Sequence, residues 1–127
     1  MDKTSLLKIG NVLILSIEGE INDFSVVSMQ EMLLGEVKNT SAPGVILNIS
    51  RLEIMDSYMA RVLSDTARMI RLMGSITVLV GVNPMIALTM VDMGLDIKEV
   101  QTALNLDGAL EMLKGLRLSA EYPEESA

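Results

Sequence analysis

The order of apolar and polar residues along the chain predicts alternating strands and helices. Residues 5–17 contain two apolar runs separated by Gly10-Asn11, a pair typical of tight turns, so this segment should form a hairpin. From about Asp23 the apolar residues recur at spacings of three and four, which indicates an amphipathic helix that ends near Asn39. Its expected inward positions are Val26, Met29, Leu33 and Val37.

The middle of the chain predicts a buried strand followed by a long helix. Pro43-Gly44 interrupts the helical pattern, and residues 45–49 form a continuous apolar run of the kind that is covered on both faces of a sheet. A second amphipathic pattern begins at Ser57 and is closed by Gly74. Its expected apolar stripe comprises Val62, Met69, Ile70 and Met73, and the opposite face carries Arg61, Asp65 and Arg68.

The last third of the chain repeats the alternation. Residues 76–80 predict another buried strand, and Asn83-Pro84 predicts a helix start, because asparagine caps helices and proline fits their first position. Residues 84–93 are apolar in nearly all directions. One side of that helix should therefore face something other than the sheet. That side could bind a partner, or the apolar run could have arisen by chance and face solvent.

The chain should end in a short edge strand at residues 96–100 and a last helix at 105–116, with Ala109, Leu110 and Leu113 facing inward. These elements together favour helices packed on a mostly parallel or mixed sheet. We expect a single domain, residues 1–117, because 127 residues can bury one hydrophobic core but not two. Residues 118–127 are acidic and poor in apolar side chains, which predicts a disordered tail.

Composition argues against several classes of function. The formal net charge of −7 disfavours binding to nucleic acid or to an anionic membrane, since both depend on clustered Lys and Arg. The chain has no cysteine and no histidine, which removes disulfides, thiolate and imidazole metal sites and the commonest general base. No apolar run is long enough to span a bilayer and no signal peptide is apparent. We predict a cytoplasmic protein without metal or cofactor.

Ser57 is the candidate functional residue, because it stands where a strand gives way to a helix and directly follows Asp56. A serine nucleophile needs a neighbouring base, but the chain has no histidine, and Ala60 occupies the position that a Ser-x-x-Lys motif requires. We therefore expect no catalytic residue and no enzyme activity. Such a serine can instead cap the helix or carry a phosphate, which the free amides and dipole of a helix start tolerate.

Two other kinds of site fit the chain less well. Asp56 follows a strand, as the phosphorylated aspartate of receiver domains does, but Glu18 and Glu20 are poor substitutes for the paired acidic metal ligands of those domains. Residues 81–84 lack both the glycine spacing and the Lys-Ser/Thr of a phosphate-binding loop, so they predict only a capped helix start.

Four segments together resemble the STAS domain, the sulfate-transporter and anti-sigma-factor-antagonist module, and most closely the RsbS-type subunit of the bacterial stressosome. They are residues 55–63, the Met73-Gly74 pair before strand 76–80, residues 81–84, and residues 102–106. The resemblance covers about residues 5–116. It implies the STAS fold, an α/β architecture with a mixed sheet of four to five strands packed against about four helices.

The resemblance also implies a function. Ser57 would be phosphorylated by an RsbT-type serine kinase and dephosphorylated by an RsbX-type phosphatase. The protein would form homo- and hetero-oligomers with sensor-bearing RsbR-type paralogues, in a large assembly that holds the kinase until stress releases it. The expected kinase or partner contacts are Asp56, Tyr58, Met59 and Arg61.

Two alternatives within the same family remain open. The protein could be a stand-alone anti-anti-sigma factor that binds an anti-sigma kinase, or a STAS domain that binds a small ligand. Simpler antagonists often have Ser-Gly after the phosphoserine where this chain has Tyr58-Met59, which weakens the first alternative.

Overall fold

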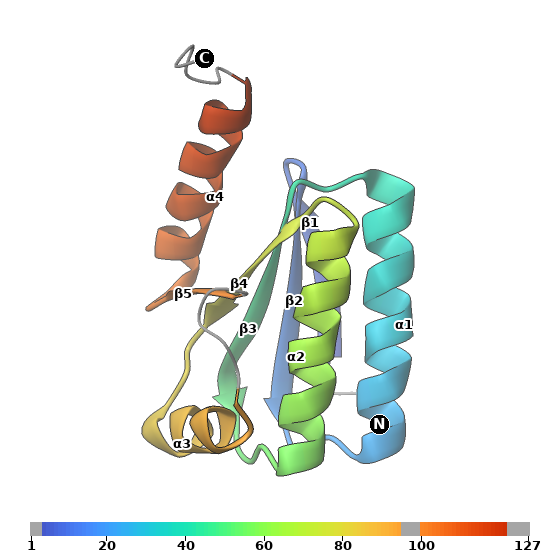
Figure 1. The fold of residues 1–127 in the computed structure, drawn as a ribbon, viewed down its shortest axis with the longest axis vertical. Helices are drawn as coiled ribbons and strands as arrows, with labels where there is room; N and C mark the ends of the chain where they lie inside the picture. The colour runs from blue at the N-terminus through green and yellow to red at the C-terminus, as the bar shows by residue number, and fades with distance from the viewer. Residues whose placement is uncertain (1–3, 95–99, 122–127) are drawn as a thin grey trace.

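Five strands and four helices make up the described part of the chain (Figure 1). The computed structural model describes residues 4–94 and 100–121, with side chains as far as Gly115. The elements are β1 (Thr4–Ile9), β2 (Val12–Gly19), α1 (Asp23–Thr40), β3 (Gly44–Leu52), α2 (Ser57–Leu72), β4 (Ile76–Val80), α3 (Pro84–Asp92), β5 (Gln101–Ala103) and α4 (Leu106–Glu121).

The strands form one mixed sheet in the order β1-β2-β3-β4-β5. β1 and β2 pair antiparallel and flank a two-residue turn, with Ile9 opposite Val12. Gly10 in that turn has a φ of 60°, which glycine adopts without strain and which suits the first central position of a hairpin turn. The remaining neighbours, β2 with β3, β3 with β4 and β4 with β5, pair parallel. The predicted hairpin and the predicted mixed sheet are confirmed.

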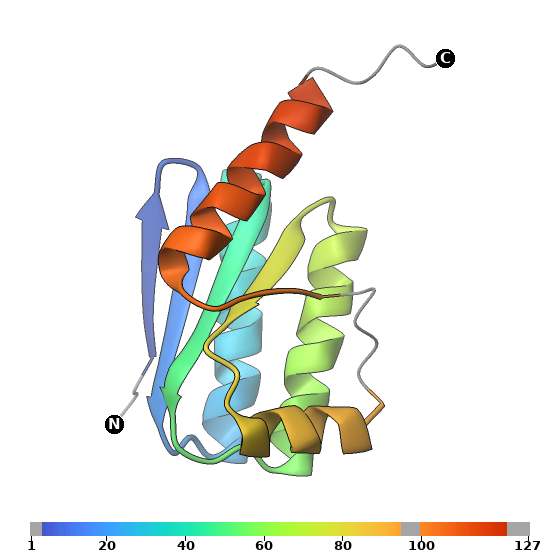
Figure 2. The same cartoon turned by 90° about the vertical axis from the view of Figure 1, so that its left-hand side faces the viewer.

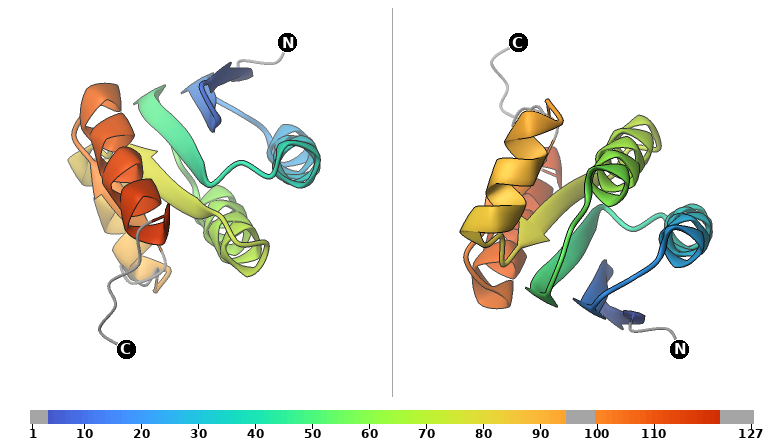
Figure 3. Two further views of the ribbon diagram at one scale, coloured as in Figure 1. Left: turned by 90° about the horizontal axis from the view of Figure 1, so that it is seen from above. Right: turned by 90° about the horizontal axis from the view of Figure 1, so that it is seen from below.

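Helices cover both faces of the sheet (Figures 2 and 3). α1 and α2 lie together on one face, whereas α4 lies on the other. The strand pattern explains this, because successive side chains of a strand point to opposite faces. Leu13, Leu15 and Ile17 pack toward α1 and α2 in the larger core cluster. Val12 and Ile14 belong to the smaller cluster that includes Ala109 and Leu113 of α4.

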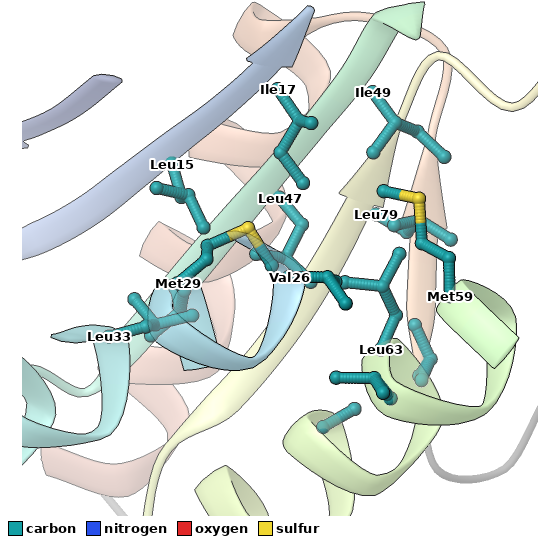
Figure 4. Close-up of a cluster of buried hydrophobic side chains, with 14 of the residues drawn as sticks. Leu15, Ile17, Val26, Met29, Leu33, Leu47, Ile49, Met59, Leu63 and Leu79 are labelled. Carbon is teal, nitrogen blue, oxygen red and sulfur yellow. The ribbon is translucent and has the colours of Figure 1, made fainter. Parts of the chain in front are cut away.

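Figure 4 shows the larger cluster at the junction of the sheet with α1 and α2. The four buried residues of α1 are Val26, Met29, Leu33 and Val37, as the spacing predicted. In α2 the prediction holds only in part. Val62 and Ile70 are buried, but Met69 and Met73 are 40% and 43% exposed. The inner face of α2 is instead made by a set that includes small residues: Met59, Ala60, Val62, Leu63, Ser64, Thr66, Ala67 and Ile70.

The C-terminal third departs from the prediction in two places. The edge strand β5 is Gln101–Ala103 and not residues 96–100, of which 96–99 lie outside the described part of the chain. α4 continues to Glu121, beyond the predicted end at Leu116, so it includes the first residues of the predicted tail. Residues 122–127 lie outside the description. Ala109 and Leu113 are buried as predicted, and Leu110 is half-buried.

Candidate functional site

The turn between β3 and α2 presents Ser57 at the start of a helix. Asp56 is the N-cap: its carboxylate Oδ1 accepts a hydrogen bond from the Met59 N–H at 2.8 Å. The Asp56 carbonyl accepts from Ala60 N at 3.0 Å, the first backbone bond of the helix. Glu53 N donates to Gly19 O at 3.0 Å, which ties the turn to the end of β2. The backbone around Ser57 is therefore held on both sides.

Ser57 is the first residue of α2, and its side chain is exposed. Because Asp56 performs the capping, the Ser57 hydroxyl is not needed for it, and it has no hydrogen-bond partner within the described residues. The helix start around it has amide groups without intrahelical partners and the positive end of the helix dipole. An exposed hydroxyl in this setting can accept a phosphate without rearrangement of the backbone.

The other predicted contact residues divide between the surface and the core. Asp56 and Arg61 are exposed, and Tyr58 is 43% exposed. Met59 is only 3% exposed and packs in the larger core cluster, as does Met55. The prediction of Met59 as a partner contact is therefore wrong for this conformation, because its side chain anchors the turn from below.

The helices α1, α2 and α3 all begin at one edge of the sheet, and Ser57 is the first residue of α2 (Figure 1). β2, β3 and β4 are parallel, so the helices that follow them start where those strands end. Each start is capped by an Asn or Asp side chain: Asn22 accepts from Ser25 N at 2.8 Å, and Asn83 accepts from Ile86 N at 2.8 Å, as Asp56 does from Met59. Three partly free helix termini thus surround one end of the sheet.

The second residue of each of these helices is a large, exposed apolar or aromatic side chain. Phe24 of α1 is 82% exposed, Tyr58 of α2 43% and Met85 of α3 80%. Ile54, in the turn before Ser57, is 57% exposed. The family resemblance implied Tyr58 as a partner contact, and the apolar pattern of residues 84–93 offered a partner surface that would include Met85, but neither Phe24 nor Ile54 was expected at such a surface. Phe24 directly follows a cap and a first helical position, and Ile54 lies in the turn before the Asp56 cap. Neither position indicates a shared surface until the helices are placed side by side.

The other features that were weighed as sites have structural roles. Glu18 lies 3.7 Å from Arg51 in an exposed ion pair, and no group of three or more acidic residues in the described ranges could hold a metal ion. Gly81 has a φ of 84°, and a Cβ there would lie 2.4 Å from the Cβ of Ser50. This glycine lets β4 leave the sheet close against the end of β3. None of the described helices combines the length and apolar composition that a bilayer crossing requires.

A half-open hollow of about 430 Å³ lies between β4, α3 and β5. Val82, Met90 and Val100 contribute to its mostly apolar lining, and Thr102 is the one polar side chain among its described lining residues. It provides the concave surface that a small-ligand-binding domain requires, but no charged group points to a ligand class. Sequence patterns did not predict it, since its walls come from three separate segments.

The fold belongs to a known class. The family model described as "STAS domain" matches residues 3–109, so the chain belongs to the STAS domain family. It is similar to RsbS: a solved structure of a serine-to-glutamate variant of Moorella thermoacetica RsbS is 36% identical, with a TM-score of 0.83, over 91% of this chain and 98% of that one.

Further similar proteins include a stressosome chain, an RsbT co-antagonist and an anti-sigma factor antagonist. A chain in a structure titled as the molecular architecture of the stressosome is 35% identical, with a TM-score of 0.76, over 89% of this chain and 98% of that one. The Bacillus subtilis RsbT co-antagonist protein RsbRA is 26% identical over 101 residues, 80% of this chain. The chain spans 37% of the length of that relative. The unphosphorylated antagonist SpoIIAA, 18% identical with a TM-score of 0.75, shares the fold.

Proposed function

We propose that this protein is a phosphorylation-switched scaffold and antagonist subunit of a bacterial stressosome. It assembles with sensor-bearing RsbR-type STAS proteins and retains an RsbT-type serine kinase until phosphorylation of Ser57 releases that kinase. The observation that carries the proposal is the position of Ser57: an exposed hydroxyl at the first residue of a helix whose cap is supplied by Asp56. Similarity to RsbS, to a stressosome chain and to an RsbT co-antagonist supports it.

The proposed kinase surface surrounds Ser57 and is mainly apolar. It comprises Phe24, Ile54, Tyr58 and Met85, with Asp56 and Arg61 at its polar side. Exposed aromatic and methionine side chains are typical anchors of protein interfaces, because they bury large apolar areas. Met59 is left out of this surface since it is buried.

Phosphorylation would act on this surface through charge. A phosphate adds about −1.5 to −2 charges at neutral pH. The phosphate on Ser57 would lie among the exposed apolar side chains of the kinase surface and beside the exposed Asp56. The net charge of the chain is already −7. A partner that buries these anchors would have to remove water from the phosphate, which weakens binding unless the partner offers matching positive charge. The helix itself tolerates the phosphate at its N-terminus, so the switch changes the surface and not the fold.

The experiment is a binding titration of the RsbT-type kinase against wild-type protein, Ser57→Ala and Ser57→Glu. We expect Ser57→Ala to bind like the wild type and to resist switching, and Ser57→Glu to bind roughly tenfold or more weakly, equivalent to about 1.4 kcal/mol. Asn39→Glu, at an exposed position at the opposite end of α1, adds the same charge away from the kinase surface and should bind normally. Equal binding by Ser57→Ala and Ser57→Glu would exclude the proposed mechanism.

Phosphopeptide mass spectrometry on protein from its own cells, before and after stress, tests whether the modification occurs. A stress-linked phosphate on Ser57 that an RsbX-type phosphatase removes supports the switch. A Ser57 that stays unmodified in every condition, in protein that still assembles, would leave a scaffold without the switch. Capture of an anti-sigma kinase in place of the RsbT-type kinase would favour the stand-alone anti-anti-sigma factor.

A further inference from the structure

The hollow between β4, α3 and β5 has the size of a small-molecule site. Its volume of about 430 Å³ lies in the range that is usual for ligand pockets, and it is half-open to solvent. Val82 and Val91 form part of its wall, and Thr102 carries the one polar side chain among the described lining residues. An apolar hollow alone does not select an occupant.

A buried hydroxyl group without a hydrogen-bond partner lies next to this hollow. Thr77 of β4 is 2% exposed, and its Oγ1 has no partner within the described residues. Such a group is unfavourable, and native proteins rarely leave one unsatisfied. Thr77 lines a void of about 10 Å³, in which Ser64 is the only other polar side chain among the described lining residues. A water molecule there would have at most two side-chain partners, fewer than the roughly three that buried waters usually bind.

Three side chains separate the void from the hollow. Leu79, Met90 and Val100 line both of them. Thr77 and Leu79 are two residues apart in β4, so their side chains point to the same face of the sheet. Met90 is unbranched and has three rotatable bonds, which lets a methionine adapt to spaces of irregular shape. A rotation of Met90 would join the hollow to the void and bring the Thr77 hydroxyl within reach of a molecule in the hollow.

The lining selects the chemical class of that molecule. No charged residue occurs among the described residues that line the hollow or the void. An ionised group placed there would lose its water without gaining a counter-charge, which is strongly unfavourable. The apolar walls favour an apolar body, and the Thr77 hydroxyl can donate or accept a hydrogen bond. The lining therefore fits a neutral molecule with one hydroxyl or carbonyl group and does not fit a nucleotide or another anion.

We propose that this hollow binds a neutral, mainly apolar small molecule, whose single polar group passes Met90 and hydrogen-bonds to the hydroxyl of Thr77. The apolar body of the molecule lies in the hollow, and its polar group supplies the partner that Thr77 lacks. None of the described lining residues belongs to the kinase surface around Ser57. Binding at this site is therefore independent of the proposed role of Ser57, and each can fail without the other.

Naphthol is a suitable probe, because it is a fluorescent and neutral aromatic molecule with a single hydroxyl group. The chain has no tryptophan, so fluorescence from the protein interferes little. Naphthalene lacks the hydroxyl, and naphthoate carries a negative charge on the same rings. The wild type should bind naphthol saturably and at least as tightly as naphthalene, although naphthalene is the more apolar of the two. Naphthoate should not bind at the same concentrations, and comparable binding of naphthoate would contradict the neutral class.

Thr77→Val tests the hydrogen bond, because it removes the hydroxyl and keeps the shape of the side chain. It should weaken naphthol relative to naphthalene by roughly fivefold or more. Ser75→Ala is the matched control: Ser75 is also 2% exposed and its hydroxyl is also unpartnered in the described chain, but it lines neither the hollow nor the void. The control should leave the ratio of the two affinities unchanged. An unchanged ratio in Thr77→Val, or an equal change in both variants, would exclude the assigned role of Thr77.

NMR of the methionine methyl groups locates the bound probe. The Met90 signal, assigned by its loss in Met90→Leu, should shift as naphthol is added. Met29 is equally buried in the larger core cluster but does not line the hollow, so its signal should stay in place. The proposed site is wrong if the wild type binds no naphthol saturably, or if saturable binding shifts Met29 and leaves Met90 unchanged.

Discussion

The carboxylate of Asp56 accepts a hydrogen bond from the backbone N–H of Met59, with 2.8 Å between Oδ1 and N. The two residues on either side of Ser57 and Tyr58 thereby close the first turn of α2, and Met59 also anchors that turn in the core. Asp56 supplies the cap, so Ser57 is left exposed and without a structural hydrogen bond in the described chain.

Removal of the Asp56 carboxylate should destabilise the protein by about 1 kcal/mol. Asp56→Ala leaves the Met59 N–H without its side-chain acceptor, and loss of an N-cap costs about 0.5 to 2 kcal/mol. Asp56→Asn keeps a capping oxygen and should remain close to the wild type, because Asn and Asp cap about equally well. Urea unfolding of the two variants measures the difference. Equal losses in both would show that the charge of Asp56, and not its capping oxygen, stabilises the turn.

A negative charge at Ser57 should leave the fold intact. Ser57→Glu adds an acidic group to an exposed first helical position, where the helix dipole favours it by about 0.3 to 1 kcal/mol. Its melting temperature should therefore equal or slightly exceed that of the wild type.

Ser64→Glu is the matched control on the same helix. Ser64 is only 8% exposed, so the same substitution there buries a charge and should destabilise the protein by about 3 kcal/mol or more. If Ser57→Glu also unfolds the protein, a phosphate at Ser57 cannot act on the surface alone.

Gly81→Ala should be more damaging than Gly74→Ala. Both glycines have a positive φ, 84° and 91°, which costs another residue about 1 to 2 kcal/mol. A Cβ at Gly74 would meet no atom within 4 Å, whereas a Cβ at Gly81 would lie 2.5 Å from the Cα of Ser50. The difference between the two variants in chemical denaturation isolates the close packing of β4 on β3. Equal losses would mean that the end of β3 can move away at little cost.

Ile70 and Met69 should respond very differently to truncation, although the hydrophobic pattern placed them in one stripe. Ile70 is fully buried, so Ile70→Ala should destabilise the protein by about 2 to 5 kcal/mol. Met69 is 40% exposed, and Met69→Ala should cost less than about 1 kcal/mol. Unfolding free energies measured at the same temperature check the ratio. Similar values would mean that Met69 packs against a partner or a second copy under those conditions.

The error about α2 has a physical origin. Met69 and Met73 are as apolar as the residues that do face inward, so composition alone cannot rank them. The inward direction is set by Ala60, Leu63 and Ala67, whose spacing matches that of Ile70, and by the close approach of α1. The small alanines carry little hydrophobic signal, but they allow the helices to approach.

The edge strand was misplaced for a similar reason. β5 is three residues long, and its position is set by pairing with β4, Val78 opposite Gln101 through Val80 opposite Ala103. A strand this short has too few residues to show a period of its own. Its position depends on a neighbour that is more than twenty residues away in the chain.

The sequence by itself determined the elements that depend on nearby residues. Gly10-Asn11 predicted the turn of the hairpin, and Asn83-Pro84 predicted the start of α3. The spacing of apolar residues in α1 predicted the residues that this helix buries. Turns, caps and amphipathic faces arise from interactions within a few residues, so their signals are local.

Only the tertiary structure decided which of these elements meet. The parallel pairing of β2, β3 and β4 brings the starts of α1, α2 and α3 to one edge, where Phe24, Tyr58 and Met85 are exposed around the capped turn of Ser57. It also leaves β1 at the outside of the sheet with Leu7 uncovered. Such surfaces combine residues that are far apart in the chain. Long-range strand pairing and core packing create them, and no local pattern encodes those contacts.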